Sequence, residues 1–287
     1  MKRILSVIFG ALLLASVSLS AAKPVKIQLW PDGAPTKNGL EGIEEKWNGK
    51  RLSDVSVPEL WIYPAKNPNG QAVIAAPGGG YTLLSTDNEG TMFVDWMNAQ
   101  GITLAVLMYR MPNGHSEVPL EDGRRAIEIM REKAAEYGFN PDEVGIMGSS
   151  AGGHFAATLS TMYGDKKYRP DFQILLYPVI TMTDLTHNGS RNNLLGKDAS
   201  AADIEKYSLE NRVDANTPPA FIILATDDKT VNPLNSLHYA EALQQNGVPY
   251  SMHIYPTGGH GFGFRDSYIY KPQWSAELER WLRSQKK

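Results

Sequence analysis

Two adjacent serines occupy the glycine-rich segment GSSAGGH near the middle of the chain. A serine presented on a sharp turn between a strand and a helix needs small residues two positions before and two after it, because the backbone comes close at both places. Ser150 has Gly148 and Gly152 at these positions, whereas Ser149 would have the bulky Met147 at the first. The spacing predicts Ser150 as a nucleophile for acyl transfer, with an ordinary tight connection as the alternative.

A serine nucleophile requires a base, and the chain contains six histidines. His260 lies in the glycine-rich loop YPTGGHGFG, directly after the last predicted strand, from which it can reach the carboxyl edge of a sheet. We expect His154, on the helix after the serine, to pack beneath the turn. His253 lies within a predicted strand and His238 within a predicted helix, so we interpret both as structural residues. His260 is therefore the predicted base, and the loop residue His115 carries no signal.

An acidic residue must orient the imidazole and stabilise its charged form. The segment LATDDKTVNP brings Asp227 and Asp228 directly after a predicted strand. Asp228 begins an Asp-x-x-Val pattern that ends at Val231, which favours it over Asp227; the latter would then cap or solvate the turn. The chain order Ser150, Asp228, His260 is the one expected when the nucleophile stands on such a strand–turn–helix.

Acyl transfer also needs hydrogen-bond donors for the oxyanion that develops on the carbonyl oxygen. The amide of Ala151, the residue after the nucleophile, is one expected donor. The segment APGGGY follows an earlier predicted strand and offers the amides of Gly79 and Gly80 as the second. An ordinary glycine turn is the alternative. A phosphate-binding loop is disfavoured, because Leu83 stands where a third glycine would be required and no Walker lysine follows.

Short apolar runs alternate with longer helical patterns around these motifs. The runs AVIAA, VGIM and FIILA are apolar throughout, as expected for strands of a sheet covered by helices on both faces. This alternation predicts an α/β fold with a doubly wound, mainly parallel sheet. The predicted strands are Glu59–Tyr63, Ala72–Ala76, Thr103–Tyr109, Val144–Gly148, Phe172–Pro178, Ala220–Ala225 and Tyr250–Tyr255, and the predicted helices are Gly90–Gln100, Leu120–Tyr137, Gly152–Tyr163, Pro233–Asn246 and Gln273–Ser284.

The segment 180–217 departs from this alternation, because it is polar and lacks strong periodicity. It lies between two predicted core strands, so it should emerge at the carboxyl edge of the sheet, where open α/β sheets bind ligands. We interpret it as a short cap that shapes a substrate pocket, with His187 as a candidate substrate contact. A solvated connection is the alternative.

The first 22 residues have a positive start, an apolar stretch and a small-residue exit, the pattern of a secretory signal cleaved after Ala22. A membrane anchor is the alternative, but the apolar run is short for a span. We therefore expect a secreted or periplasmic protein, consisting of one domain at 23–287 without stable membrane insertion. The chain has no cysteine and no basic cluster, which excludes disulfides and thiolate metal sites and disfavours nucleic acid as a partner.

Taken together, these motifs resemble the bacterial carbohydrate-esterase branch of the alpha/beta hydrolases, the acetyl xylan and feruloyl esterases, some of which carry xylanase-like labels. The resemblance implies an alpha/beta-hydrolase fold, Ser150 as nucleophile with Asp228 and His260, the 77–81 loop as oxyanion hole, and no cofactor or metal. The elbow of this group usually reads GFSAGGH, so Ser149 replaces an aromatic residue at the pocket floor. The segments that carry the likeness are LWPDGAPTKNGLEG, PGGGY, YRMPNGH, GSSAGGH, RPDFQILLYPVI, HNGSRNNLLG, TPPAFIILATDDKTVNP and YPTGGHGFG.

The expected function is that of an exported serine esterase that removes acyl groups, foremost acetyl, from a plant cell-wall polysaccharide such as xylan. A feruloyl esterase or other carboxylesterase is the nearest alternative, because Trp30, Tyr81, Phe262 and Phe264 could line an aromatic pocket. An inactive glycan-binding protein on the same scaffold, a glycoside hydrolase and a peptidase are further alternatives. Within this expectation, Tyr81, His187 and Phe262 are the candidate substrate contacts.

One further pair of charged residues has a structural interpretation. Arg110 ends a predicted strand and Asp122 lies near the start of the next predicted helix. We expect an ion pair between them that braces the neighbourhood of the nucleophile rather than binding substrate.

Overall fold

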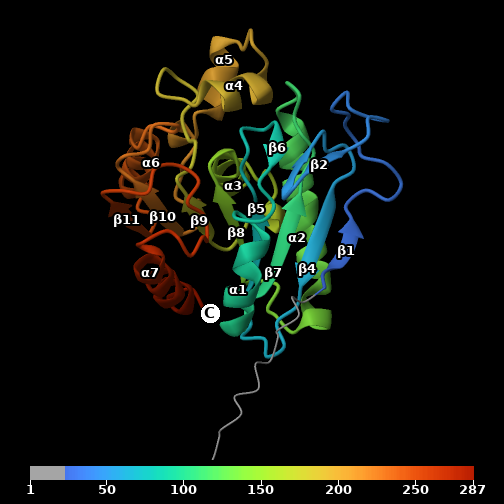
Figure 1. Cartoon of the computed structure of the whole chain (residues 1–287), viewed down its shortest axis with the longest axis vertical. Helices are drawn as coiled ribbons and strands as arrows, with labels where there is room; N and C mark the ends of the chain where they lie inside the picture. The colour runs from blue at the N-terminus through green and yellow to red at the C-terminus, as the bar shows by residue number, and fades with distance from the viewer. Residues whose placement is uncertain (1–22) are drawn as a thin grey trace, which may run out of the picture.

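A computed structural model describes residues 23–287 of the chain; the expected secretory signal at 1–22 lies outside this range. An eight-stranded sheet forms the centre of the described part, with the strand order β1-β4-β7-β5-β8-β9-β10-β11 (Figure 1). The strands are β1 (Val25–Gln28), β4 (Glu59–Tyr63), β5 (Ala72–Ala76), β7 (Thr103–Met108), β8 (Val144–Ser149), β9 (Gln173–Leu176), β10 (Ala220–Ala225) and β11 (Tyr250–Tyr255).

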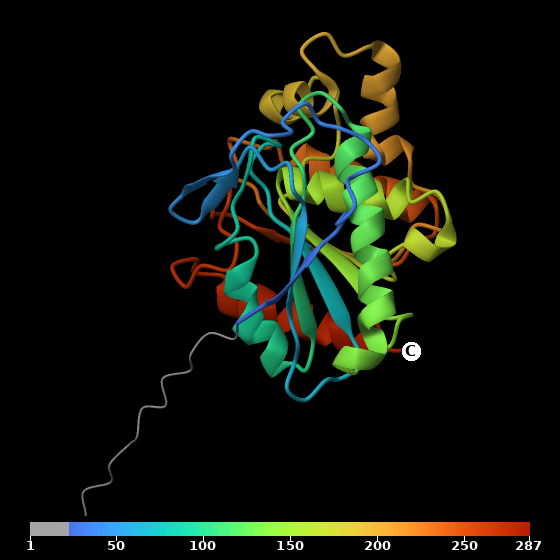
Figure 2. The same cartoon turned by 90° about the vertical axis from the view of Figure 1, so that its right-hand side faces the viewer.

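Helices cover both faces of this sheet. In Figure 2, α1 and α7 lie on one side of the strands, whereas α2 and α3 lie on the other. The helices of these layers are α1 (Val94–Ala99, preceded by the 3₁₀ turn η1 at Thr91–Phe93), α2 (Glu117–Tyr137), α3 (Ala151–Thr161), α6 (Leu234–Gln245) and α7 (Lys271–Ser284); a further 3₁₀ turn, η2, covers Lys166–Tyr168.

The central strands run parallel, which confirms the predicted doubly wound, mainly parallel sheet. Strands β7, β5, β8, β9, β10 and β11 pair in parallel, whereas β4 and β1 add antiparallel to the β7 edge. Every residue of β5, β8 and β10 is buried, as continuous apolar runs in a sheet covered on both faces should be. Because the parallel strands end at one edge, the loops that follow β5, β8, β10 and β11 meet there.

Four short strands were not predicted. Besides β1, they are β2 (Lys46–Asn48), β3 (Arg51–Ser53) and β6 (Leu83–Leu84), which form a small antiparallel sheet in the order β2-β3-β6. All three residues of β2 are exposed, and β6 has two residues, so neither carries a readable apolar alternation. Strand β9 is shorter than predicted because Tyr177, with φ 38°, leaves the extended conformation.

The segment 180–217 is more ordered than its sequence suggested. It contains α4 (Asn188–Leu195), α5 (Ala201–Tyr207) and the 3₁₀ turn η3 (Leu209–Asn211), and α4 and α5 lie at the top of the view in Figure 1. Side chains cap both helices at their first turn: His187 accepts from the amide of Ser190, and Ser200 accepts from that of Asp203. Helices this short depend on caps and tertiary contacts, which explains their weak periodicity.

Within residues 23–287, no helix combines the length and the apolar character that crossing a bilayer requires.

Candidate active site

Ser150 stands on a sharp turn between β8 and α3. Its backbone has φ 55° and ψ −121°, a conformation that side-chain-bearing residues rarely adopt. The flanking glycines make the turn possible, because a methyl group on Gly148 would overlap the carbonyl of Gly152, and one on Gly152 would overlap the carbonyl of Ala76. Ser149 is the last residue of β8 and is 1% exposed, compared with 7% for Ser150. The geometry therefore presents Ser150 alone at the carboxyl edge of the sheet.

The structure brings the three predicted residues into one hydrogen-bonded chain. His260 Nε2 lies 2.8 Å from the Oγ of Ser150, and its Nδ1 lies 2.7 Å from Asp228 Oδ2. Because the carboxylate only accepts, Nδ1 carries the proton and Nε2 is free to accept from the serine hydroxyl. The other carboxylate oxygen of Asp228 accepts the amides of Thr230 and Val231 at 2.8 and 3.0 Å. This arrangement can take a proton from Ser150 as the hydroxyl attacks.

Asp227 has a different position. Its Oδ1 accepts the amide of Gly259 at 2.7 Å, which ties the end of β10 to the loop that carries His260. Asp227 therefore supports the loop, while Asp228 contacts the imidazole.

The glycine loop after β5 lies against Ser150. A methyl group on Gly78 would come 2.9 Å from the Cβ of Ser150, so this glycine permits the close approach. The amides of Gly79, Gly80 and Ala151 donate no backbone hydrogen bond within the described chain. The amide of Gly78 is occupied, because it donates to Glu89 Oε2 at 2.8 Å. The three predicted donors are thus unused, as an oxyanion hole requires.

Comparison with known proteins agrees with this geometry. Residues 73–264 match the family profile of the alpha/beta hydrolase fold. The chain belongs to the alpha/beta hydrolase family. It is 41% identical over 238 residues to an acetylxylan esterase of Xylanibacter ruminicola, a match that covers 81% of this chain and 49% of that protein. It is 33% identical over 220 residues to endo-1,4-beta-xylanase B of Butyrivibrio fibrisolvens, covering 71% of this chain and 34% of that protein.

Among solved structures, this hydrolase is similar to the acetyl ester-xyloside bifunctional hydrolase of Caldicellulosiruptor lactoaceticus. The TM-score is 0.78 at 34% sequence identity, and the match covers 93% of this chain and 98% of that one. The chain spans half or less of the two curated relatives above. The predicted family resemblance and the alpha/beta-hydrolase fold are confirmed.

His154 of the hydrolase packs beneath the elbow, as predicted. It is fully buried; Nδ1 lies 2.9 Å from the hydroxyl of Tyr81, and Nε2 lies 2.9 Å from the carbonyl oxygen of Tyr207 at the end of α5. Nε2 must donate to that carbonyl, so Nδ1 accepts from Tyr81. Burial lowers the pKa of His154 to about 4, which keeps the ring neutral at pH 7. His154 joins the elbow helix to the 180–217 segment.

The prediction that Tyr81 contacts substrate is corrected. Its side chain is 2% exposed, and its hydroxyl is used by His154, so it packs under the glycine loop. The predicted aromatic pocket does not form either. Trp30 donates to Asp122, and Phe264 packs against Phe93, so Trp30, Tyr81, Phe262 and Phe264 belong to separate clusters.

His187 lies beside the glycine loop of the site, and Phe262 lies in the loop that carries His260. The Cε1 of His187 would be 3.6 Å from a methyl group on Gly80, so the half-buried imidazole stands beside the glycine loop. Its Nδ1 accepts from the amide of Ser190, which leaves Nε2 as the protonated nitrogen of the neutral ring. Burial lowers the pKa of His187, and the nearby His260 adds to this effect. Phe262 lines a cavity of about 260 Å³ together with His260.

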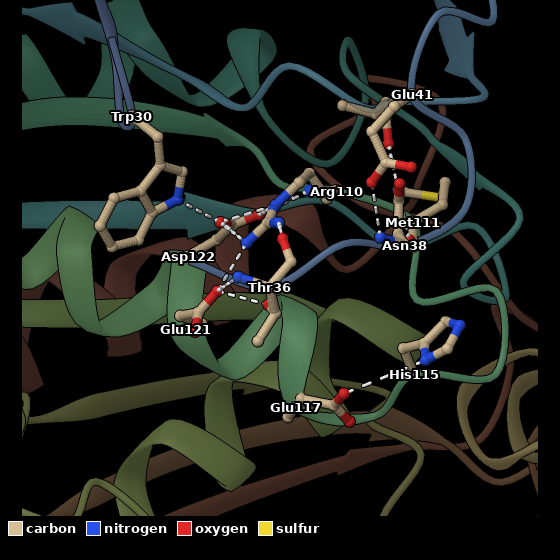
Figure 3. A network of polar contacts seen from close by, with 11 residues as sticks. Trp30, Thr36, Asn38, Glu41, Arg110, Met111, His115, Glu117, Glu121 and Asp122 are labelled. Carbon is tan, nitrogen blue, oxygen red and sulfur yellow. Dashed lines mark hydrogen bonds and ion pairs between the residues drawn. The ribbon is translucent and has the colours of Figure 1, made fainter. Parts of the chain in front are cut away.

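The predicted ion pair between Arg110 and Asp122 is confirmed (Figure 3). Both side chains are buried, and Nη2 of Arg110 lies 2.7 Å from Asp122 Oδ1. The guanidinium also donates to the carbonyl of Thr36 at 2.6 Å and to Glu121, while Trp30 donates to Asp122. The pair therefore fixes the N-terminal loop to the start of α2.

Two residues that the sequence analysis did not single out contact the two loops of the site. Glu89 accepts the amide of Gly78, and Tyr177 packs its ring against His260 with a centroid separation of 4.9 Å. No spacing pattern marks either residue. The loop lengths between them give no sign that they meet. Among residues 23–287, no group of three or more histidine and acidic side chains could hold a metal ion.

Proposed function

We propose that this hydrolase is a serine esterase that removes acetyl groups from xylan or a related plant cell-wall polysaccharide. The observation that carries the proposal is the hydrogen-bonded chain Ser150–His260–Asp228 beside three unused amides. The acetylxylan esterase relative supports the acetyl group and the polysaccharide as the substrate class.

The proposed reaction has two steps. The Oγ of Ser150 attacks the ester carbonyl while His260 takes its proton, and the amides of Ala151 and of Gly79 or Gly80 hold the oxyanion. The C–O bond to the sugar then breaks, and His260 returns the proton to the departing sugar oxygen. Water, deprotonated by His260, next attacks the acetyl-serine, which releases acetate and restores the Ser150 hydroxyl.

Two cavities that share Arg265, one of them lined by His260, support a substrate with an extended sugar chain. One, of about 260 Å³, is lined by His260, Phe262, Arg265 and Tyr268 among others. The second, of about 480 Å³, shares Arg265 and continues along polar residues, namely Asn48, Lys50, Arg51, Ser85, Asp87 and Asn88. Hydroxyl-rich chains are bound by polar side chains of this kind, so the sugar would lie here while its acetyl group reaches Ser150.

We further propose that 180–217 is a cap that shapes the acyl side of the pocket. His187 supports this, because it begins α4 and stands beside Gly80. Asn193 of the same helix donates to the carbonyl of Gly80 at 2.8 Å, which fixes the glycine loop. A feruloyl specificity has less support, because the four aromatic side chains that suggested it do not share a pocket.

The test is product analysis with the purified protein and its Ser150→Ala variant. Acetylated xylan and feruloylated arabinoxylan are incubated separately, and free acetate, ferulate and shortened sugar chains are quantified. Acetate released by the parent protein and absent with the variant supports the proposal. Ferulate alone would favour the feruloyl alternative, and shortened chains without acid release would indicate a glycosidase instead.

We also propose that residues 1–22 direct export. N-terminal sequencing of the protein recovered from the periplasm or medium of a bacterial host should begin at Lys23. A protein that is retained in the cytoplasm with Met1 intact would contradict export and leave the esterase proposal untouched.

A further inference from the structure

A buried carboxylate lies between the glycine loop and the histidine loop. Glu89 is 5% exposed, and its Oε2 accepts the amide of Gly78 at 2.8 Å. Its Oε1 accepts the hydroxyl of Tyr177 at 2.8 Å. No lysine or arginine lies within ion-pair distance of Glu89 among residues 23–287. A buried carboxylate without a cation is costly, so its retention beside a reactive centre needs an explanation.

Tyr177 connects this carboxylate to His260. The backbone of Tyr177 has φ 38°, a conformation that tyrosine rarely adopts, which turns the side chain at the end of β9. Its ring lies 4.9 Å from that of His260 and 4.5 Å from that of Phe262, in edge-to-face arrangements. Its hydroxyl accepts the amide of Gly263 at 3.0 Å. The ring thus supports the imidazole, and the hydroxyl holds the loop that carries it.

The pattern of donors indicates that Glu89 is ionised. The oxygen of Tyr177 already accepts from the amide of Gly263, so its proton is available to Glu89, and Gly78 can only donate. Both oxygens of Glu89 therefore accept. Burial raises the pKa of Glu89, while these two hydrogen bonds and the charge of His260 oppose that rise.

We infer that Glu89 is a positioning residue that couples the oxyanion loop to His260 and supplies a second negative charge for the imidazolium. This inference rests on the proposed esterase function. Asp228 holds the imidazole directly, whereas Glu89 acts through Gly78 and Tyr177. When His260 takes the proton of Ser150, the negative charges of Asp228 and Glu89 both stabilise the imidazolium.

Other titratable and charged groups near His260 and Glu89 also influence the pH profile. His260 is also faced by His187 from the start of α4, and Glu89 by Tyr109 and by the more distant Arg265. None of them changes in the variants below, so a difference between variants reports on Glu89.

The main variant is Glu89→Gln, which keeps the size of the side chain and removes its charge. We expect kcat to fall about 10- to 100-fold with KM for p-nitrophenyl acetate within about threefold. The acidic limb of the kcat/KM profile should move to lower pH by roughly 0.5–1 unit, because the imidazolium loses a stabilising charge. A purely structural role would lower kcat without moving that limb.

Asp95→Asn is the matched control. Asp95 lies in the first turn of α1, six residues after Glu89, and carries the same charge, but it is exposed and lies outside the residues placed at the site. We expect its kcat and its acidic limb to match those of the parent protein within about twofold and 0.2 unit respectively, because exposed charges are screened.

Tyr177→Phe separates the effect of the Tyr177 hydroxyl, which links Glu89 to the histidine loop, from the effect of the Glu89 charge. It keeps the ring against His260 and removes the hydroxyl, so kcat should fall about tenfold. Tyr177→Phe also tests the inference if Glu89→Gln does not fold. Circular dichroism and thermal unfolding will show whether each variant folds. Wild-type kcat in both variants, or a fall in Glu89→Gln with an unmoved acidic limb, would overturn the inference.

An NMR titration of His260 in ¹³C-histidine-labelled protein keeps the test independent of turnover. We expect the titration midpoint of His260 to lie at lower pH in Glu89→Gln than in the parent protein, and an unchanged midpoint overturns the inference. Failure of the proposed function looks different: the parent protein would then not hydrolyse esters, or Ser150→Ala would remain active, whatever the titration gives.

Discussion

The Nε2 atom of His260 lies 2.8 Å from the Oγ of Ser150, although the two residues are 110 positions apart. This contact depends on two loops that follow different strands of one parallel sheet, β8 and β11. Because parallel strands end at the same edge, the fold brings both loops together before any substrate arrives. Asp228, after β10, contacts Nδ1 on the other side of the imidazole and completes the hydrogen-bonded chain.

Replacing the nucleophile gives the first prediction. Ser150→Ala should lower kcat for an acetyl ester by roughly four to six powers of ten, because no oxygen remains for His260 to activate. Initial rates with p-nitrophenyl acetate measure this effect. Ser149→Ala is the control: its hydroxyl is buried without a hydrogen-bond partner within residues 23–287, so its activity should stay within about tenfold. Near-normal turnover by Ser150→Ala would refute the mechanism.

The two adjacent aspartates give the second prediction. Asp228→Asn should lower kcat about 10⁴-fold, because an amide in its place stabilises neither the required tautomer nor the imidazolium. Asp227→Asn weakens one contact to the amide of Gly259 and should cost no more than about tenfold. The measurement is kcat of each variant, and kcat of Asp228→Asn should be the lower of the two. If Asp227→Asn were the more damaging, the assignment of the acidic residue would have to be reversed.

His154 predicts how stability depends on pH. Its pKa is about 4 in the folded protein, below the ordinary value of 6.5, because the ring is buried. Between these values the unfolded chain binds the additional proton, so the free energy of unfolding falls as the pH drops from about 6.5 to about 4, by about 3 kcal/mol in total. Above pH 6.5 this contribution is fully present.

The test compares urea unfolding at pH 7.5 and pH 4.5. His154→Gln should have a lower free energy of unfolding than the parent protein at pH 7.5. This difference should be smaller at pH 4.5, because the parent protein loses stability when its unfolded chain protonates His154, whereas glutamine takes up no proton. His115→Gln, at an exposed loop position, should keep the parent's pH dependence. An equal gap for His154→Gln at both pH values would contradict the assignment of a neutral, buried imidazole.

The buried ion pair gives the fourth prediction. Arg110→Met leaves the carboxylate of Asp122 buried without its cation and should lower the free energy of unfolding by about 3–5 kcal/mol. Arg125→Met removes a more exposed arginine that pairs with Glu128 and Glu132, and should cost about 1 kcal/mol or less. Urea denaturation at pH 7.5 compares them. Equal losses in the free energy of unfolding would mean that the buried Arg110–Asp122 pair contributes no more to stability than an exposed ion pair does.

Much of the fold could be read from local sequence. The bounds of β5 and β10 agree with the predicted runs, because strands buried on both faces need continuous apolar residues. The bounds of β4 and β11 also agree, although these two strands are partly exposed. The short strands β2 and β6 could not be read in this way. Both pair with β3, a contact that their own short sequences do not indicate.

The sequence by itself determined which residues are able to do the chemistry. Glycines two positions on either side of Ser150 permit its turn, and the order of the acidic residue and His260 along the chain follows from the order of the strands. These features depend on near neighbours and on topology, so a single chain carries them.

Only the tertiary structure decided which side chains meet. It buried Tyr81 against His154, kept the four candidate aromatic residues apart, and set Glu89 beneath the glycine loop and Tyr177. Each of these contacts joins segments far apart in the chain, through packing and hydrogen bonds that no local pattern encodes. For that reason the candidate nucleophile could be recognised from the heptapeptide GSSAGGH, whereas the residues that support His260 became visible only in the folded chain.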